Sequence, residues 1–148
     1  MQITVLSKND IKGGAAIAAL RLHKAFRENS SKLEINSKMR VIFKESELND
    51  VYGEKSYFLK KRIYINNKIE RILQKLQSTS NTNYHSMSFL PSGIHRELNK
   101  LSSQILNIHW VNGGMLSIEE IAKIKKPCVW TLHDTWAFSG SEHYPNGI

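Results

Sequence analysis

Gln2-Ile3-Thr4-Val5-Leu6, the turn ending in Lys12-Gly13-Gly14, and the run that starts at Ala15-Ala16-Ile17-Ala18-Ala19 together decide the fold. The first stretch is rich in β-branched and aliphatic residues, which favours a short strand. Glycine pairs are typical of turns. From Ala15 to about Arg27, small and apolar residues recur at helical spacing. Strand, glycine turn and helix open a βαβ unit, the start of a parallel α/β sheet.

The rest of the chain repeats this alternation. Ser117 and Glu120 have the spacing of a helix-capping box, and Cys128 lies in an apolar run typical of a buried strand. The other predicted elements are strands at 39–43, 104–111 and 128–132, a short strand end at 88–91, a loop at 78–86, and helices at 60–77 and 117–125. The helix at 15–27 is expected to pack through residues 15, 18, 22, 25 and 26. We therefore predict one Rossmann-like α/β domain over residues 1–148, with a parallel sheet and flanking helices.

Composition narrows the class of protein. The 148 residues are 41% hydrophobic, enough for one domain with a core. The sequence has no run of about 20 apolar residues and no basic leader, so we expect a cytoplasmic protein. The net charge is +8. The excess lies in residues 1–78, which contain 16 Lys and Arg against 8 Asp and Glu. Such an excess favours anionic partners.

The helix expected at 60–77 is amphipathic. It has an apolar stripe of Ile65, Ile69, Ile72, Leu73 and Leu76, and a basic stripe of Lys61, Lys68, Arg71 and Lys75 on another face. The basic stripe fits either a solvated face or contact with the anionic surface of the inner membrane. Nucleic acid is not an expected partner, because no recognised binding motif is present.

Three loops are expected to meet at one edge of the sheet. In open parallel sheets, ligands bind at the carboxyl ends of the strands. Gly13 and Gly14, residues 109–114 and residues 133–143 all follow predicted strands. Gly13-Gly14 before a helix suits a phosphate or diphosphate, although a tight turn without a ligand fits as well.

His133 and Asp134 lie at the end of the last predicted strand. A histidine there can hydrogen-bond a sugar hydroxyl or a developing oxyanion, or act as a base; the alternative is a structural histidine. His133, Asp134, Glu142 and His143 include the residue types that bind zinc. They lack a recognised zinc-binding spacing, so we expect no metal.

Three runs resemble family 4 glycosyltransferases, closest to the group that makes colanic acid, lipopolysaccharide and capsule sugars. These runs are residues 12–26, 108–118 and 129–144. The resemblance implies the amino-terminal, acceptor-side half of a GT-B fold, in which two Rossmann-like domains face across a cleft. It also implies retaining hexosyl transfer from a nucleotide sugar to a surface-polysaccharide or lipid-linked acceptor, without a metal or other cofactor.

The resemblance also implies roles for particular residues. Gly13 and Gly14 would lie near the donor diphosphate, and His133 would be the catalytic residue that reaches the donor sugar. The other residues expected to bind substrate are His109, Asn112, Gly113, Gly114, Asp134, Trp136, Glu142, His143 and Tyr144. The basic helix would contact the inner membrane, where lipid-linked acceptors reside.

The sequence departs from that family in one large respect. The carboxyl-terminal donor-binding domain is not part of these 148 residues, and the chain ends in a loop. We therefore predict a truncated chain that does not transfer sugar by itself. The alternative function is that of a non-catalytic α/β module that binds an anion or a membrane surface.

Overall fold

The computed structural model describes residues 1–76 and 83–144. The strands are β1 (Gln2–Asn9), β2 (Asn36–Phe43), β3 (Val51–Tyr52), β4 (Ile105–Ile108) and β5 (Cys128–Trp130). The helices are α1 (Gly14–Glu28), α2 (Ser30–Leu33), α3 (Tyr57–Leu76), α4 (His95–Leu98) and α5 (Ile118–Ala122). The predicted loop at 78–86 and the predicted chain end at 145–148 lie partly or wholly outside the described residues.

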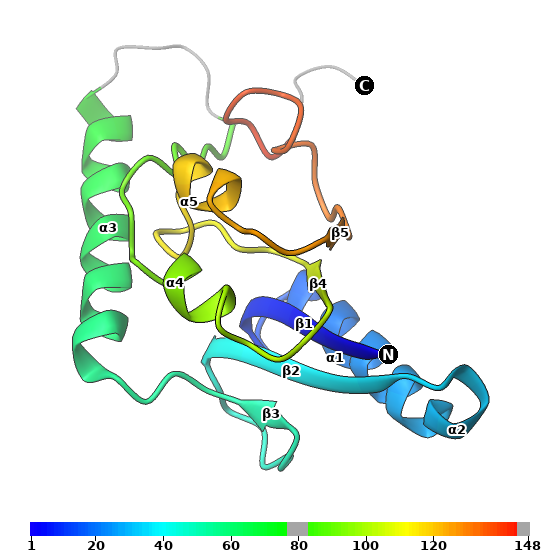
Figure 1. Ribbon diagram of the computed structural model, residues 1–148. Helices are drawn as coiled ribbons and strands as arrows, with labels where there is room; N and C mark the ends of the chain where they lie inside the picture. The colour runs from blue at the N-terminus through cyan, green and yellow to red at the C-terminus, as the bar shows by residue number, and fades with distance from the viewer. Residues whose placement is uncertain (77–82, 145–148) are drawn as a thin grey trace.

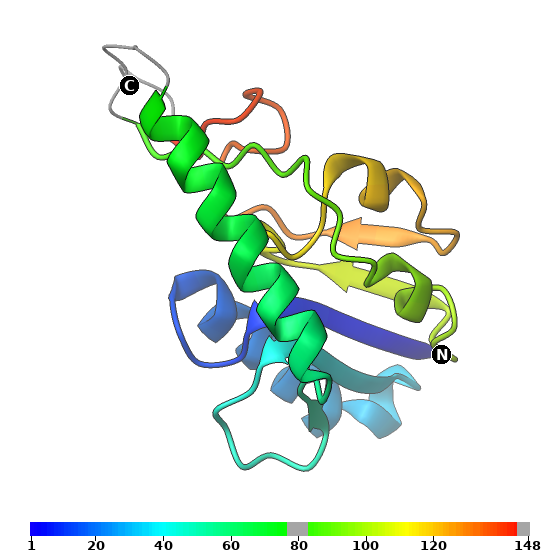
Figure 2. The same cartoon turned by 90° about the vertical axis from the view of Figure 1, so that its left-hand side faces the viewer.

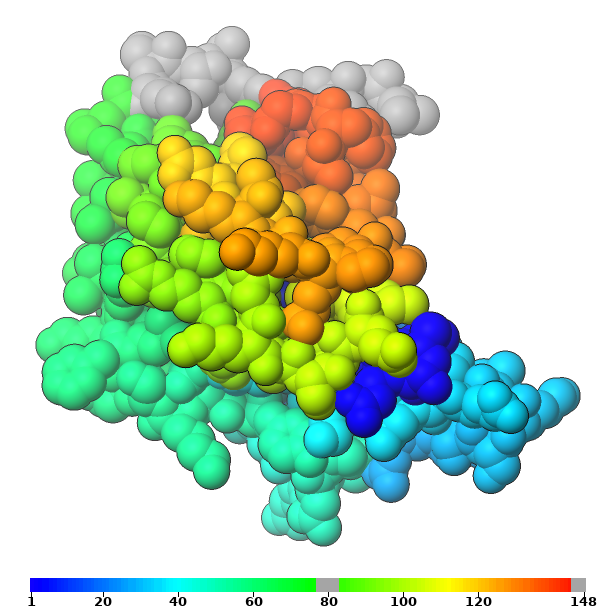
Figure 3. Space-filling model, in the orientation of Figure 1, coloured from blue at the N-terminus to red at the C-terminus, as the bar shows by residue number. Residues whose placement is uncertain are grey.

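The five strands form one sheet in the order β3-β2-β1-β4-β5, and every neighbouring pair is parallel. Helix α1 covers one face, while α3, α4 and α5 lie on the other side (Figures 1 and 2). In the space-filling view, α4 and α5 face the reader with α3 beside them (Figure 3). This arrangement confirms the predicted Rossmann-like α/β fold.

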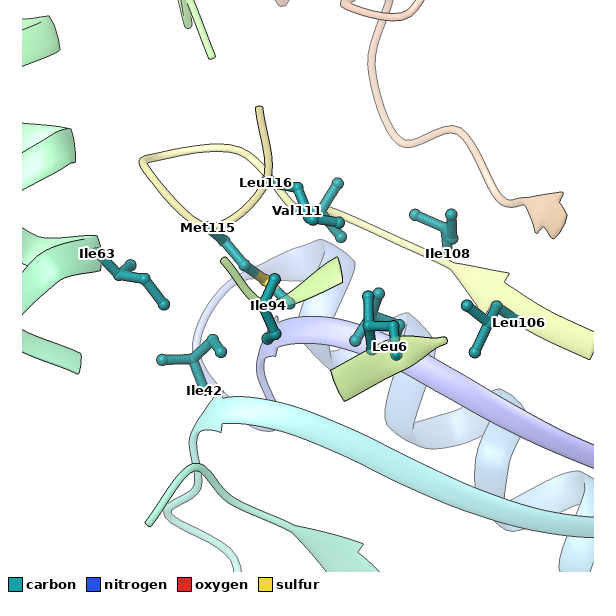
Figure 4. Packing of buried hydrophobic residues seen from close by; sticks show 10 residues of the cluster. Leu6, Ile42, Ile63, Ile94, Leu106, Ile108, Val111, Met115 and Leu116 are labelled. Carbon is teal, nitrogen blue, oxygen red and sulfur yellow. The ribbon is translucent and has the colours of Figure 1, made fainter. Parts of the chain in front are cut away.

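A hydrophobic cluster lies on each face of the sheet. The larger one joins strand residues such as Leu6, Ile42 and Leu106 to Ile63 of α3 and Met115 of the loop after β4 (Figure 4). The smaller cluster lies under α1 and consists of Val5, Ala19, Met39, Val41 and Val51. Alternate residues of β1 and β2 therefore serve opposite faces, as expected for strands covered by helices on both sides.

The predicted packing face of α1 is confirmed only at Phe26, which packs against the smaller cluster. The buried residues are Ala16, Ala19 and His23, whereas positions 15, 18, 22 and 25 are partly or fully exposed. His23 bonds to Ser37 Oγ at 2.8 Å and Asp50 Oδ2 at 2.6 Å. The buried face of α1 contains a polar residue, His23. The spacing of the apolar residues alone therefore predicted a neighbouring face of the helix.

Two predicted strands also need correction. Strand β5 was expected to be buried, but Cys128 and Val129 are exposed. Because β5 is at the edge of the sheet and α1 packs on β1 and β2, the α1 side of β5 has less cover. No strand forms at 88–91, where Ser88 has a φ of 46°, a left-handed conformation that interrupts an extended chain.

Helix α3 packs through a face that its apolar stripe does not predict. Its buried residues are Ile63, Asn66 and Glu70. Next to them lies Gly114, where a Cβ atom would be 2.4 Å from Ile63 O and 2.7 Å from Asn67 N. The helix and the glycine loop are therefore in close backbone contact, and the apolar stripe is left facing outward.

Candidate functional site

A cavity of about 620 Å³ opens at the carboxyl ends of β1, β4 and β5. The three loops predicted to meet there all contribute to it, through Gly13-Gly14, Trp110 and His133. The remaining lining residues are Ser7, Lys8, Asn9, Lys12, Ala15, Ala16, Tyr84, Asp134, His143 and Tyr144. The structure thus brings together residues as far apart in the chain as Ser7 and Tyr144, as the rule for parallel sheets predicts.

Gly13 and Gly14 form one wall of this cavity. Gly13 has a φ of 91°, and no other atom lies within 4 Å of the place that a Cβ would take at either glycine. No side chain caps the amino-terminal end of α1. The first N–H groups of a helix have no partner within the helix. This open glycine wall can therefore approach an anion, which the positive end of the helix dipole favours.

His133 is far from these glycines in the sequence, yet it lines the same cavity. Its Nε2 is 2.8 Å from Nδ1 of His109, and the two ring planes differ by 28° with centroids 5.0 Å apart, so the rings meet edge to edge. Nε2 of His109 is in turn 2.8 Å from Oδ1 of Asn107. Burial lowers the pKa of His133, and the charge of Asp134 partly opposes this.

Lys8 is a cavity residue that the sequence reasoning missed. Its Nζ donates to Gly113 O at 2.7 Å and lies 5.6 Å from the centre of the Trp110 ring. Burial lowers the pKa of Lys8 to about 8, and the charge of Glu70 opposes this shift. The position of Lys8 at the end of a predicted strand was the signal available in the sequence. Its amine adds a cation to the lining of the cavity.

Asp134 and His143, both predicted to bind substrate, bond chiefly to each other. Asp134 Oδ2 pairs with His143 Nδ1, and His143 Nε2 is 2.7 Å from Ser86 Oγ. Trp136 Nε1 donates to Ser86 O at 2.7 Å. These bonds attach the loop after β5 to the segment around Ser86. His143 and Tyr144 still line the cavity, so their rings can contact a ligand even though both nitrogens of His143 have partners.

Other predicted substrate residues do not line this cavity. Asn112 is buried and its Nδ2 lies 3.3 Å from Ser88 Oγ, while Trp136 is buried against Ser86. Gly114 packs on α3, and Gly113 contributes its carbonyl oxygen to Lys8. The backbone of Glu142 pairs with that of His85 in an isolated antiparallel β-bridge, and Glu142 Oε1 lies 3.5 Å from His85 Nε2. His109 is also buried and acts through His133.

The four residues of the basic stripe on α3, Lys61, Lys68, Arg71 and Lys75, are exposed. Lys68, Arg71 and Lys75 line a shallow hollow of about 290 Å³ along the helix, together with Tyr64, Asn67 and Ile72. Lys61 lies further towards the start of α3 and is exposed as well. These residues form a surface of their own, separate from the lining of the cavity at the strand ends.

A larger cavity, of about 780 Å³, lies near the opposite edge of the sheet. Arg40, Tyr52 and Glu54 are among its lining residues. Arg40 is buried and already paired with Glu54 and Glu97. Since this arginine is neutralised and the cavity lies away from the strand ends, the smaller cavity is the better candidate site.

The chain was also compared with known proteins. No protein-family model matches it, and neither the curated proteins nor the solved structures gave a significant match. A functional proposal for this chain therefore rests on its residues, its fold and the geometry of the cavity.

Proposed function

We propose that the chain is part of a sugar-nucleotide-dependent glycosyltransferase, which transfers a hexosyl group with retention to a surface-polysaccharide or lipid-linked acceptor. The observation that carries this proposal is the cavity itself, where the uncapped start of α1 faces the same space as His133. The first feature suits a diphosphate, and the second suits a sugar hydroxyl. The reaction class and its stereochemistry come from the resemblance of residues 12–26, 108–118 and 129–144 to family 4 glycosyltransferases.

In this reaction the protein must stabilise a leaving nucleoside diphosphate. Preorganised donors aimed at the developing charge are effective where water is excluded. The glycine wall offers backbone N–H groups, and the partly buried amine of Lys8 offers a cation in the lining of the same cavity. A volume of about 620 Å³ lies within the range of roughly 300 to 1,000 Å³ that is usual for ligand pockets.

Calorimetric titrations with UDP-glucose and with UDP, as probes of the donor class, test this assignment. His133→Phe keeps an aromatic ring but removes both nitrogens. We expect it to weaken UDP-glucose about tenfold, the loss of one hydrogen bond, and to leave UDP unchanged. Phe138→Ser, an exposed change in the same loop that does not line the cavity, is the control. Equal affinity of wild type and His133→Phe for UDP-glucose, or no binding of either probe at millimolar concentration, would contradict the assignment of this cavity to the donor.

A second candidate function is docking on an anionic membrane surface, and the outward face of α3 favours it. Phe58 is 82% exposed and Leu76 is 74% exposed. Ile65, Ile69, Ile72 and Leu73 lie between them on the exposed side of the helix. Next to this apolar stripe are the exposed residues Lys61, Lys68, Arg71 and Lys75. A helix with an apolar stripe beside a row of cations is typical of one that lies in a membrane interface. No described helix is long and apolar enough to cross a bilayer.

Vesicle sedimentation separates the charge from the apolar stripe. We expect the triple change Lys68→Gln, Arg71→Gln and Lys75→Gln to weaken binding to phosphatidylglycerol vesicles on the order of a hundredfold, since each cation near such a surface is worth about 1 kcal/mol. The matched control removes three exposed cations elsewhere, with Arg21→Gln, Lys24→Gln and Lys32→Gln.

The apolar part of the same surface is tested with Phe58→Ser and Ile72→Ser. These changes should weaken binding without altering its dependence on salt. If the α3 triple variant and the control triple variant lost similar affinity for the vesicles, the effect would come from net charge and not from the position of the cations on α3. A dimer in sedimentation velocity that Phe58→Ser and Ile72→Ser abolish would instead make this stripe a contact between copies of the chain.

A further inference from the structure

The side-chain amide of Asn107 has a defined orientation. Its Nδ2 lies 3.1 Å from Val129 O and 3.0 Å from Thr131 Oγ1, both at β5. A backbone carbonyl can only accept a hydrogen bond, so the nitrogen of the amide must face it. The oxygen of Asn107 therefore faces Nε2 of His109, 2.8 Å away. Since that oxygen can only accept, Nε2 of His109 must carry a proton.

The protonation state of His109 follows from its surroundings. The residue is 2% exposed. Burial lowers the pKa of His109 to about 4, and the charge of neighbouring His133 acts in the same direction. A neutral imidazole has one N–H and one bare nitrogen. Because Nε2 holds the proton, Nδ1 of His109 is the bare nitrogen, and it faces Nε2 of His133 at 2.8 Å.

The donor and the acceptor of each hydrogen bond between β5 and the cavity are thereby fixed. His133 must donate from Nε2 to His109, which donates from Nε2 to Asn107, which donates to β5. The remaining nitrogen of His133, Nδ1, has no hydrogen-bond partner within residues 1–76 and 83–144. His133 itself lines the cavity at the strand ends.

We propose that Asn107 and His109 are positioning residues that hold the proton of His133 on Nε2, so that its Nδ1 accepts a hydrogen bond from a hydroxyl group of a sugar ligand. The ligand class in this statement rests on the function proposed above; the proton arrangement does not. A free neutral histidine exchanges its proton between both nitrogens. The relay of hydrogen bonds from His133 through His109 to Asn107 removes that freedom, and the bond between the two rings also limits the direction of Nδ1. A fixed acceptor selects ligands that place a hydroxyl group at one point.

Side-chain ¹⁵N correlation spectra of the whole chain at neutral pH, recorded without ligand, test the proton arrangement. We expect His133 and His109 each to show one tautomer, protonated at Nε2, with a slowly exchanging Hε2 proton on His133. His109→Phe keeps an aromatic ring but removes the acceptor. In this variant the His133 Hε2 proton should exchange about tenfold faster, as the loss of one ordinary hydrogen bond implies, and both tautomers should appear.

His109→Gln is the conservative variant, because an amide supplies both an acceptor for His133 and a donor for Asn107. It should restore the single tautomer. His23, which is bonded to Ser37 and Asp50 in another part of the fold, reports whether each variant is still folded. A wild-type His133 that is protonated on Nδ1, or a His109→Phe spectrum identical to wild type, would overturn the proposal.

Addition of UDP-glucose to the same samples separates this inference from the proposed function. If the nucleotide sugar binds, the Nδ1 resonance of His133 should shift while its tautomer stays the same. If no sugar nucleotide binds but the single tautomer is found, the assignment of the ligand is wrong and the relay is right. A switch of the proton to Nδ1 on binding would contradict the role given to that nitrogen.

Discussion

Single glycines illustrate how much of this fold depends on the space around one residue. Gly14, Gly140 and Gly114 differ in two properties, the sign of φ and the room for a Cβ atom. Gly14 has neither constraint, and Gly140 has a φ of 84° but open space. Gly114 has a φ of 81°, and its Cβ would lie 2.4 Å from a backbone oxygen of α3. The three positions therefore form a graded series.

We predict that alanine at these positions gives graded losses of stability. Gly14→Ala should be neutral or stabilise by up to about 1 kcal/mol, since it removes backbone freedom at the start of α1. Gly140→Ala should cost about 1 kcal/mol through left-handed strain alone. Gly114→Ala should cost about 3 kcal/mol, because strain is added to overpacking. Urea unfolding of the three variants measures the order, and a Gly114→Ala variant as stable as Gly140→Ala would refute the contact with α3.

The amine of Lys8 changes its charge near the pH of most binding experiments. It is charged below its pKa of about 8 and neutral above it. Binding of UDP should therefore weaken as the pH rises through 8, because a cation next to the diphosphate is lost. Lys8→Met should bind UDP more weakly below pH 8 and show no such pH dependence. Lys12→Met, which changes an exposed lysine of the same cavity, should retain it; calorimetry at several pH values compares the three proteins.

The sequence places His133 and His109 at predicted strand ends, but it does not show the hydrogen bond that joins them. A histidine that follows an apolar run is visible in the sequence as a strand-end residue. Asn107 and His109 share a face of β4 and its extension, and their meaning depends on β5 lying beside them. Lys8 reads as one of many basic residues until Trp110 and Gly113 surround it. Contacts between distant segments therefore carry the part of the site that the sequence does not show.

Among the elements, α3 and α5 show opposite degrees of predictability. The capping box of α5 is a local pattern, and the structure confirms it: Ser117 and Glu120 bond to each other's backbone N–H groups. The position of α3 was predicted well, whereas the face that packs was not. Periodicity says which residues share a face of a helix, but not which face contacts the sheet. In α3 that choice follows from the close approach of Gly114 and from Ile63 in the core.

At α5 we predict different costs for the two members of the capping box. Ser117→Ala should cost about 1 kcal/mol, the usual value for a lost amino-terminal cap. Glu120→Ala should cost about 3 kcal/mol, because its buried carboxylate also accepts hydrogen bonds from Ser92 N and Gly93 N and pairs with His95. Chemical denaturation compares the two. If Glu120→Ala cost no more than Ser117→Ala, Glu120 would be no more than a helix cap.

At the scale of the whole molecule, the order of elements was sufficient to predict the parallel sheet. Strand, glycine turn and helix at the start, and strand, helix and strand near the end, leave few arrangements that obey right-handed crossovers. The two-residue strand β3 and the four-residue helices α2 and α4 were missed. Such short elements depend on tertiary contacts more than on local pattern. The convergence of the three loops followed from the parallel sheet, because the carboxyl ends of all its strands then lie on one edge.

The proposed function depends most on where a nucleotide sugar binds. Backbone amide shifts of the ¹⁵N-labelled chain, recorded while UDP-glucose is added, measure this directly. We predict changes centred on Gly13, Gly14, Trp110 and the residues around His133. The contrary result would be changes centred on Arg40, Tyr52 and Gly53 around the larger cavity, or no changes at millimolar ligand.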